Sequence, residues 1–461
     1  MQIEHELNFV ILHPENKEGK NMRIHLFKPA LLLWVAGIFT CVNSVSAHEL
    51  NMTINDLFKL AEQSNVDIKV ARHDVEISKE QKKSALAERL PDISISATMN
   101  YLGNATIMER DFSGWGGSHM PHLGNSLSLS AYQPLYTGGE ITAKINKAKN
   151  RQNIAENELT QISNKKKILI LEYFLNLFKQ RNLLSVYEEN IELTRRLISE
   201  MRVRSKQGLA LSNDVTRYEL NLSNLNYERT TVIDDIDYLN NSLLSFLDLD
   251  KETVIVPTLH FADSMKCAAS SDIWMEYALQ NSPDLKKTDL SYAQTQLEEK
   301  LLRSKKLPKI GFKIGDDLEG PITNRSPILN KNINRWWVGV QLSFNISAPY
   351  KERGNIAAAR LESSKLLDQR KSLQDEIERQ LDRAYKDYTE AFEQVKTQEI
   401  NVKLAKENYR IVNLRYSNDF SLLTDMLDAS AQKLDAEVRL VNARTNAIYY
   451  YYQLKYISGT L

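Results

Sequence analysis

The segment Asp92–Tyr101 reads DISISATMNY, in which polar and apolar side chains alternate without interruption. This period of two predicts a β-strand with one polar and one apolar face. The same alternation predicts four strands in all, at about residues 92–102, 124–134, 309–316 and 336–346. Their polar faces carry mostly Ser, Thr, Asn and Gly, which suits a wet interior. Tyr101, Trp336 and Trp337 stand at predicted strand ends, where membrane-interface aromatic residues are found.

Outside these strands, the period of the sequence becomes helical over very long stretches. No proline interrupts Gly139–Gln207, and a single helix of this length would span about 100 Å. Apolar side chains in heptad spacing, such as Tyr173, Leu177 and Leu184, predict coiled-coil packing. Four long helices are expected at about residues 139–207, 211–247, 351–417 and 422–458. The expected fold class is therefore mainly α with a small β part.

The two halves of the sequence repeat one design. Leu90–Ile93 reads LPDI and recurs as LPKI at Leu307–Ile310, and Arg204–Asp214 aligns without a gap with Arg415–Asp425. A spacing of about 210 to 217 residues is far longer than the repeat of a solenoid protein. We therefore predict a duplicated half-protein, with repeats at residues 48–249 and 250–461.

Residues 1–47 are predicted to be an N-terminal extension and a signal peptide. Arg23 and Lys28 precede an apolar run, Ala30–Cys41, which is too short to span a bilayer comfortably. The small residues of Val45–Ala47 then offer a cleavage site, so the sequence predicts export from the cytoplasm. Met22 is an alternative start, and lipidation of Cys41 is an alternative that the sequence leaves open.

Other side-chain clusters do not indicate a catalytic site. No segment matches a nucleotide-binding, hydrolase or zinc-protease motif, so we expect no enzyme, cofactor or metal. Basic and acidic residues number 59 each, which argues against nucleic acid as a partner. His119 and His122 are spaced as a metal-binding pair, but no third ligand is near them in the sequence. Lys165–Lys167 is expected to be a solvated helix face. Tyr449–Tyr452 is expected to pack against helices close to the barrel rather than to form a binding site.

Strands with an exposed apolar face need a second sheet or lipid to cover that face. A soluble sandwich would belong to a non-transporting periplasmic coiled-coil structural or adhesin-like protein, and this alternative stays open. The very long helices between the two strand pairs favour lipid instead. In lipid, strands must close into a barrel, and known membrane barrels begin at about eight strands. Four strands per chain therefore predict a barrel shared between copies of the chain.

Two segments carry a resemblance to a known family. Gln133–Gly139 reads QPLYTGG, and Leu422–Ala429 reads LLTDMLDA. With the duplication, they resemble the TolC-type outer-membrane efflux proteins, or outer membrane factors, over nearly all of residues 48–461. The resemblance implies a homotrimer in the Gram-negative outer membrane, with a shared 12-stranded β-barrel and a periplasmic tunnel of long helices. It also implies a passive export duct that works with a periplasmic adaptor and an inner-membrane pump, RND-type or ABC-type.

The resemblance assigns functional positions as well. It places a periplasmic gate at Asp214, Tyr416, Ser421, Asp425 and Asp428, tip turns at Gly208 and Asp419, and strand-to-helix junctions at Pro134, Gly138, Gly139 and Pro349. Ser421 stands where the best-known members carry arginine, which puts one restraint of the closed gate in doubt. In a trimer, Asp425 and Asp428 would give six carboxylates, whose repulsion should raise some pKa values and attract cations. The alternative is that both are surface residues matched to a helix dipole.

Overall fold

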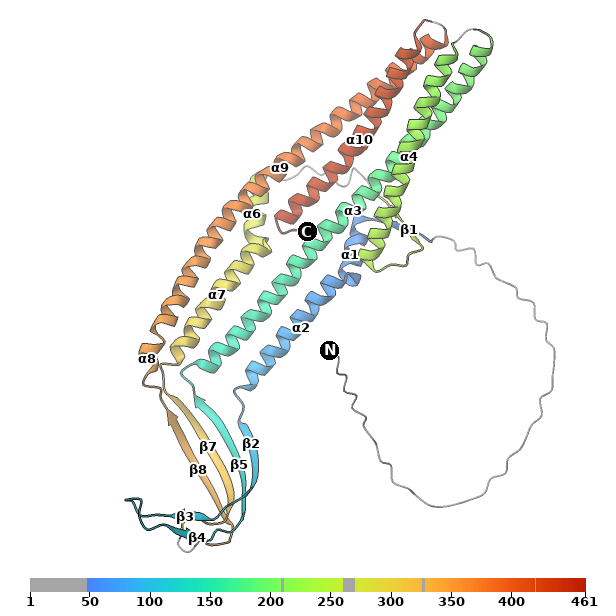
Figure 1. Cartoon of the computed structure of the whole chain (residues 1–461). Helices are drawn as coiled ribbons and strands as arrows, with labels where there is room; N and C mark the ends of the chain where they lie inside the picture. Colours follow the sequence, from blue (N-terminus) through green and yellow to red (C-terminus); the bar gives the residue numbers. More distant parts are fainter. Residues whose placement is uncertain (1–47, 209–210, 260–269, 326–327, 419) are drawn as a thin grey trace, which may run out of the picture. The chain divides into compact units, whose positions relative to one another are not determined.

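A computed structural model describes residues 48–208, 211–259, 270–325, 328–418 and 420–461. The predicted signal peptide, Met22 and Cys41 lie outside the described residues, and so does Asp419. Residues 47–461 form one compact unit. Its long helices lie side by side, and the main sheet continues from one end of them (Figure 1). The predicted class, mainly α with a small β part, is confirmed.

Four strands form one antiparallel sheet. They are β2 (Asp92–Tyr101), β5 (Leu123–Tyr136), β7 (Lys309–Gly320) and β8 (Ile333–Ser343), in the order β2-β5-β7-β8. The pairing of β5 with β7 joins the two halves of the chain. The register places Ile93 opposite Ala131, Ala131 opposite Ile314, and Ile314 opposite Val338. Most apolar residues of the four strands therefore share one face of the sheet.

The ends of β7 and β8 differ from the prediction. β7 continues to Gly320 rather than 316, and β8 spans Ile333–Ser343 rather than 336–346. Asp316 and Asp317 break the alternation of side chains, but the backbone ladder continues through them to the pair Glu319–Ile333. β8 ends early because Asn345 starts a turn, in which its side chain accepts a hydrogen bond from the Ser347 N–H at 3.1 Å.

Two short sheets were not predicted. β1 (His48–Met52) pairs in parallel with β6 (Thr253–Pro257), and β3 (Ala105–Ile107) forms a hairpin with β4 (Gly116–Ser118). The hairpin follows β2, which leaves the helices at Asp92, so it lies at the end of the main sheet away from the helices (Figure 1).

Helices make up most of the unit. They are α1 (Ile54–Ser64), α2 (Val66–Ala87), α3 (Glu140–Lys206), α4 (Ser212–Leu247), α6 (Ser271–Asn281), α7 (Pro283–Ser304), α8 (Ala348–Lys351), α9 (Arg353–Ser417) and α10 (Leu423–Ile457). With 67 and 65 residues, α3 and α9 are the longest of these, and each extends about 100 Å. Among the helices of the described residues, none combines the length and the apolar composition of a membrane-spanning helix.

In both repeats, a polar side chain stands between the first two helices and caps the second one. The Asn65 side chain ends α1 and caps α2, accepting a hydrogen bond from the Asp67 N–H at 3.1 Å. In the second repeat, the Ser282 hydroxyl accepts from the Leu285 N–H at 3.4 Å and caps α7. Side-chain oxygens at this position satisfy N–H groups that the first turn of a helix leaves unpaired.

The tyrosines Tyr449–Tyr452 pack against helices, as predicted, but they do not lie near the main sheet. Tyr452 stacks edge to face on Phe58 of α1 at 5.8 Å, and Tyr449 joins the core cluster around Phe174 and Leu243. The reason is length: α10 has 35 residues, so it extends only about 50 Å and ends roughly halfway along its partner α9.

In the lysine run Lys165–Lys167, Lys165 is exposed as predicted, but the prediction of a solvated face is wrong for the other two. Lys166 forms an ion pair with Asp67 of α2. Lys167 forms an ion pair with Glu62 of α1 at 2.6 Å, and its side chain is only 12% exposed. These lysines therefore attach α3 to the first two helices.

Candidate gate and strand-to-helix junction

The second tip, residues 418–428, connects α9 to α10. The Asp425 carboxylate accepts hydrogen bonds from the Leu422 N–H at 3.0 Å and from the Ser421 hydroxyl at 2.9 Å. The Leu422 N–H and, next, the Ser421 hydroxyl hold the pKa of Asp425 below its ordinary value. Asp425 is therefore charged at neutral pH, in the first turn of a helix where negative charge is favoured.

Asp428 lies on the same side of α10, three residues further on. Its Oδ2 accepts a hydrogen bond from the Gln432 side chain at 2.8 Å. Both carboxylates are exposed, whereas Met426 and Ala429 between and after them are buried. The packing of α10 thus turns this pair of acidic side chains outward from the chain's own core. The rise of some pKa values predicted for a trimer depends on neighbouring copies and stays a prediction.

Tyr416 packs against α3. Its hydroxyl donates a hydrogen bond to the Met201 sulfur at 2.8 Å, and the Arg204 guanidinium lies 5.6 Å from its ring. It packs on a core cluster that includes Tyr218 and Met426. Tyr416 therefore connects α9 to α3 within one chain.

The first tip, residues 207–217, connects α3 to α4. Gly208 has a φ of +76°, the left-handed conformation in which glycine commonly ends a helix. The Asp214 carboxylate accepts a hydrogen bond from the Leu211 N–H at 3.3 Å. Asp214 thus occupies at the first tip the place that Asp425 occupies at the second.

A buried charge cluster inside the helices was not predicted. Its members are Lys433 and Glu437 of α10, Asn190 of α3, and Lys406 and Tyr409 of α9. The side chains of Lys433 and Glu437 are only 8% exposed and lie 3.8 Å apart. Glu437 also contacts Lys406 at 3.1 Å and Asn190 at 3.3 Å. The Lys433 ammonium lies 5.6 Å from the Tyr409 ring, and burial raises the pKa of Tyr409 to about 12.

The first strand-to-helix junction depends on Gly138 and Gly139, between β5 and α3. Both have a left-handed φ, +63° and +85°. A Cβ on Gly138 would also lie 2.7 Å from the Leu307 Cβ and 2.9 Å from the Ser304 carbonyl oxygen. Only glycine meets both requirements at 138, because this turn packs closely against the end of α7 and the connection from α7 to β7. Pro134 lies in β5 beside an irregularity of the β5–β7 register, which suits a residue without an N–H.

The second junction has a different design. β8 leads into the short helix α8, with Pro349 in its first turn, before α9 begins at Arg353. Proline is well tolerated at this position, because the first N–H groups of a helix have no acceptor within the helix.

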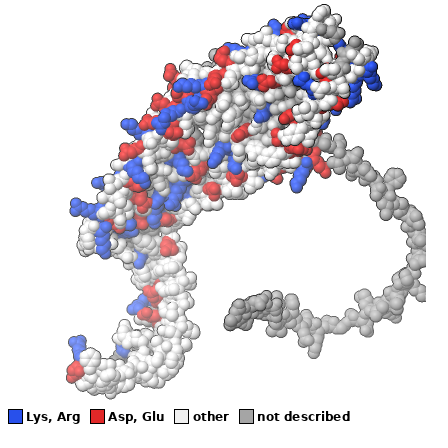
Figure 2. All heavy atoms as spheres, turned by 45° about the horizontal axis from the view of Figure 1, so that its top comes forward, with Lys and Arg blue, Asp and Glu red and all other residues white. Residues whose placement is uncertain are grey.

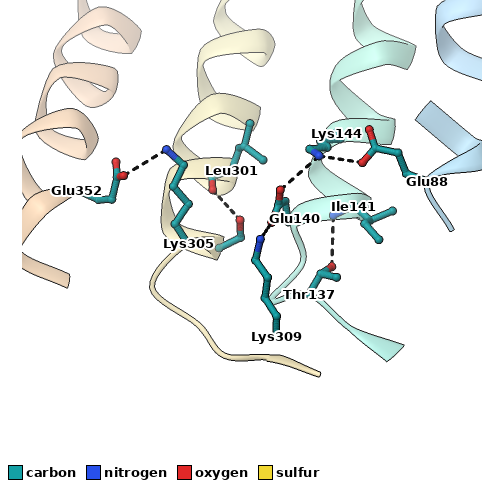
Figure 3. Close-up of polar contacts among 10 residues, drawn as sticks. Glu88, Thr137, Glu140, Ile141, Lys144, Leu301, Lys305, Lys309 and Glu352 are labelled. Carbon is teal, nitrogen blue, oxygen red and sulfur yellow. Dashed lines mark hydrogen bonds and ion pairs between the residues drawn. The ribbon is translucent and has the colours of Figure 1, made fainter. Parts of the chain in front are cut away.

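Charged side chains connect the helices at both junctions (Figure 3). Glu140 at the start of α3 pairs with Lys309 and, at 3.3 Å, with Lys144, which also contacts Glu88 at 2.9 Å. Burial acts most strongly on Glu140 and raises its pKa, but Lys309 and Lys144 together bring the pKa below its usual value. In the second repeat, Glu352 pairs with Lys305 at 3.2 Å.

The chain belongs to the outer membrane efflux protein family. The family description matches residues 57–226 and again residues 274–460, one match for each repeat. This confirms the resemblance to TolC-type channels and the duplicated fold. A search of curated proteins found no sequence match.

Solved structures of outer-membrane channels share this fold. The OprN channel superposes with a TM-score of 0.73 at 15% identity, over 88% of this chain and 90% of that chain. VceC of Vibrio cholerae gives 0.71 at 14% identity, over 88% and 96%. The open state of the MtrE channel of Neisseria gonorrhoeae gives 0.71 at 14% identity, over 88% and 89%.

Proposed function

We propose that this chain is the outer-membrane duct of a tripartite export system, in which three copies complete one barrel and one helical tunnel. A periplasmic adaptor and an inner-membrane pump would deliver the substrate and supply the energy, and the chain itself would catalyse no reaction. The observation that carries the proposal is the main sheet. It has one mainly apolar face and two outer edges, on β2 and β8, that pair with no further strand among the described residues.

The apolar face is exposed in the single chain. Ile95 is 72% exposed and Leu342 is 67% exposed, although side chains of this size are normally buried in water-soluble proteins. Charged side chains are dense over the helices and sparse over the sheet on the face that Figure 2 shows. A face of this kind is stable when acyl chains surround it.

Asp316 brings a negative charge to this face. The register places it between Leu129 and Trp336. It lies in the half of β7 farther from the helices. Tryptophan favours the boundary between lipid tails and headgroups, and a carboxylate near this boundary costs only about 0–1 kcal/mol. Asp316 is therefore compatible with a sheet whose far end reaches the headgroups.

The two edges favour assembly with further copies. Neighbouring strands in the order β2-β5-β7-β8 are antiparallel throughout. The β8 of one copy can therefore continue the alternation by pairing with the β2 of the next. In lipid, unpaired edges are not tolerated, and closed rotational symmetry removes them. Three copies would give the twelve strands that the family resemblance implies.

A pair of neighbouring substitutions tests the sheet assignment. Ile95→Asp puts a charge on the apolar face, and Ser94→Asp puts the same charge on the polar face of the same strand. We expect Ile95→Asp to abolish barrel assembly and Ser94→Asp to be tolerated. The readouts are fractionation with the outer membrane, the mass of the detergent-solubilised particle, and conductance in planar bilayers. A water-soluble monomer released by osmotic shock would instead support the periplasmic structural alternative.

We also propose that the second tip forms the periplasmic gate. Three features support this: Asp425 and Asp428 are exposed on one side of α10, Asp425 is held in its charged form, and the tip is at the end of α9 away from the sheet. Three copies would gather six carboxylates around one axis and attract cations. Ser421 binds Asp425 within its own chain, so the closed state would lack the restraint of an arginine at this position.

The gate is tested by cation block of the single-channel current. Asp425→Asn combined with Asp428→Asn should abolish block by multivalent cations, because the carboxylates that attract them are gone. Asp248→Asn, at the end of α4 away from the tips, is the control that removes a carboxylate outside the gate, and it should leave the block in place. If multivalent cations block the current of the double variant as strongly as that of the unchanged protein, these two residues do not line the constriction.

A further inference from the structure

A pair of histidines lies next to the β3–β4 hairpin, at the end of the sheet away from the helices. His119 directly follows β4, and His122 directly precedes β5. Their rings lie 5.5 Å apart, edge to face at 82°. The gate and the junction do not use either residue, so the pair needs an explanation of its own.

His122 is held in place by three contacts with the end of β2. The Leu102 N–H donates to the His122 carbonyl oxygen at 2.8 Å. The ring Nδ1 of His122 lies 2.8 Å from the Leu102 carbonyl oxygen, and the Tyr101 ring stacks on the imidazole at 5.1 Å. The backbone and the ring are therefore both fixed before any ligand binds.

These contacts also decide which nitrogen of His122 can bind a metal. A carbonyl oxygen accepts hydrogen bonds and cannot donate them, so Nδ1 must carry the proton. In the neutral ring, Nε2 then has a free lone pair. Histidines that ligate metals almost always donate their other ring N–H to a carbonyl or carboxylate in this manner.

The spacing of the two rings fits a shared ion. With metal–nitrogen bonds of about 2.0–2.1 Å, each ring centroid would lie about 3 Å from the ion, and a tetrahedral angle would separate the centroids by about 5 Å. The observed separation is 5.5 Å. His119 is exposed, and exposed side chains change rotamer within nanoseconds, so it can turn a nitrogen toward the ion.

The geometry points to a two-histidine site for a late transition-metal ion, Cu²⁺, Ni²⁺ or Zn²⁺, formed by His119 and His122. Imidazole suits these ions, whereas Mg²⁺ and Ca²⁺ prefer oxygen ligands. Within the described ranges, no group of three or more His, Cys, Asp and Glu side chains is placed to hold a metal. Water or an external ligand fills the remaining coordination positions, so the ion stays exchangeable. The site does not depend on the proposed export function.

Titration of the full-length, untagged protein in detergent with Cu²⁺ alone tests the site. We expect about one tight ion per chain with two coordinated nitrogens in the electron paramagnetic resonance spectrum. His119→Gln and His122→Gln should each weaken binding at least about tenfold. Glutamine at 122 keeps an N–H donor for the Leu102 carbonyl, so the loop is disturbed little. The mass of the detergent-solubilised particle and the circular dichroism spectrum of each variant show that the protein is still folded and assembled.

His73→Gln on α2 is the matched control, because His73 is exposed and far from this loop in the sequence. It should bind Cu²⁺ with the affinity of the unchanged protein. A variant that carries both His119→Gln and His122→Gln measures how much Cu²⁺ binds elsewhere on the chain. The inference is overturned if His119→Gln binds with full affinity, if His73→Gln weakens binding equally, or if only one nitrogen is coordinated. None of these outcomes affects the proposed duct.

Discussion

At the first tip, Asp214 accepts a hydrogen bond from the Leu211 N–H, and at the second tip Asp425 accepts the equivalent bond from the Leu422 N–H. The gap-free alignment of the repeats, continued along α4 and α10, then places Arg217 opposite Asp428. It also places Leu222 and Asn226 opposite Lys433 and Glu437, both in the buried charge cluster. The backbone plan is the same at both tips, while the charges at these aligned positions differ between the two repeats.

This difference indicates that the two repeats have different structural roles. The first repeat carries the tighter backbone requirement, at Gly138 and Gly139. The second repeat carries the exposed carboxylates and the buried charges on α10, the helix that we assign to the gate. Substitutions that make one repeat resemble the other therefore test which differences matter.

The largest effect is expected in the buried charge cluster. Glu437→Asn gives α10 the residue of the first repeat and removes the buried carboxylate beside Lys433, which keeps, among the described residues, only the exposed Glu189 of α3, at 3.6 Å, as an acidic partner. This should cost up to about 3 kcal/mol of unfolding free energy. Adding Lys433→Leu completes the exchange and should restore most of the loss, because a buried pair replaced by matched residues is often nearly neutral. Thermal unfolding in detergent measures both. Equal losses in the single and the double variant would show that the two charges are not coupled.

The next effect concerns the junctions. Gly138→Ala combines a left-handed φ with a clash against Leu307 and Ser304, and should destabilise the protein by about 2 kcal/mol. Gly354 lies in α9, where an added methyl group meets no atom within 4 Å, so Gly354→Ala should stabilise by about 0.5–1 kcal/mol. Unfolding midpoints that shift in the same direction for both variants would contradict this contrast.

A smaller effect is expected from exchanging charge at the tips. Asp428→Arg gives the second tip the side chain of the first tip and should raise the half-blocking concentration of a multivalent cation at least about tenfold. Arg217→Asp is the reciprocal variant, and it should strengthen block only if the first tip also lines the opening. Single-channel recordings at one salt concentration compare the two.

The smallest effect is a pH dependence of the junction charges. Since the folded-state pKa of Glu140 is lowered, its contribution to stability is present above the ordinary value of 4.5 and is lost as the pH falls through the folded pKa. The pKa of Glu352 is also lowered, first by Asn355 and then by Lys305, so the same sign applies. Glu140→Gln and Glu352→Gln should each flatten the fall in unfolding temperature below pH 4.5. An unchanged slope would show that these ion pairs do not contribute.

The strands and long helices could be predicted because each has a strict period over many residues. The five-residue strands β1 and β6 could not, since neither has enough alternation and each depends on a partner about 200 residues away. The extension of β7 was not predicted, because the acidic pair Asp316 and Asp317 interrupts the alternation of apolar and polar side chains. The backbone pairing continues through both residues, since it does not depend on side-chain type.

The candidate site was predicted in part. The acidic first turn at Asp425 follows from helix electrostatics, but the hydroxyl of Ser421 beside it was visible only in the structure. Lys433 and Glu437 are four residues apart, a spacing typical of solvated ion pairs on helices. Their burial depends on α3 and α9, which contact them only after folding.

Because β2 and β8 are the two outer strands of each chain, every subunit of a closed ring offers one edge to each neighbour. A chain in which β2 or β8 can no longer pair would still take a place in the ring, and it would leave one strand edge of the barrel unpaired. In cells that make equal amounts of intact and damaged chains, random mixing would leave only about one ring in eight free of damage if three chains assemble. Such a lesion would act in a dominant-negative manner, although each damaged chain keeps a complete set of helices.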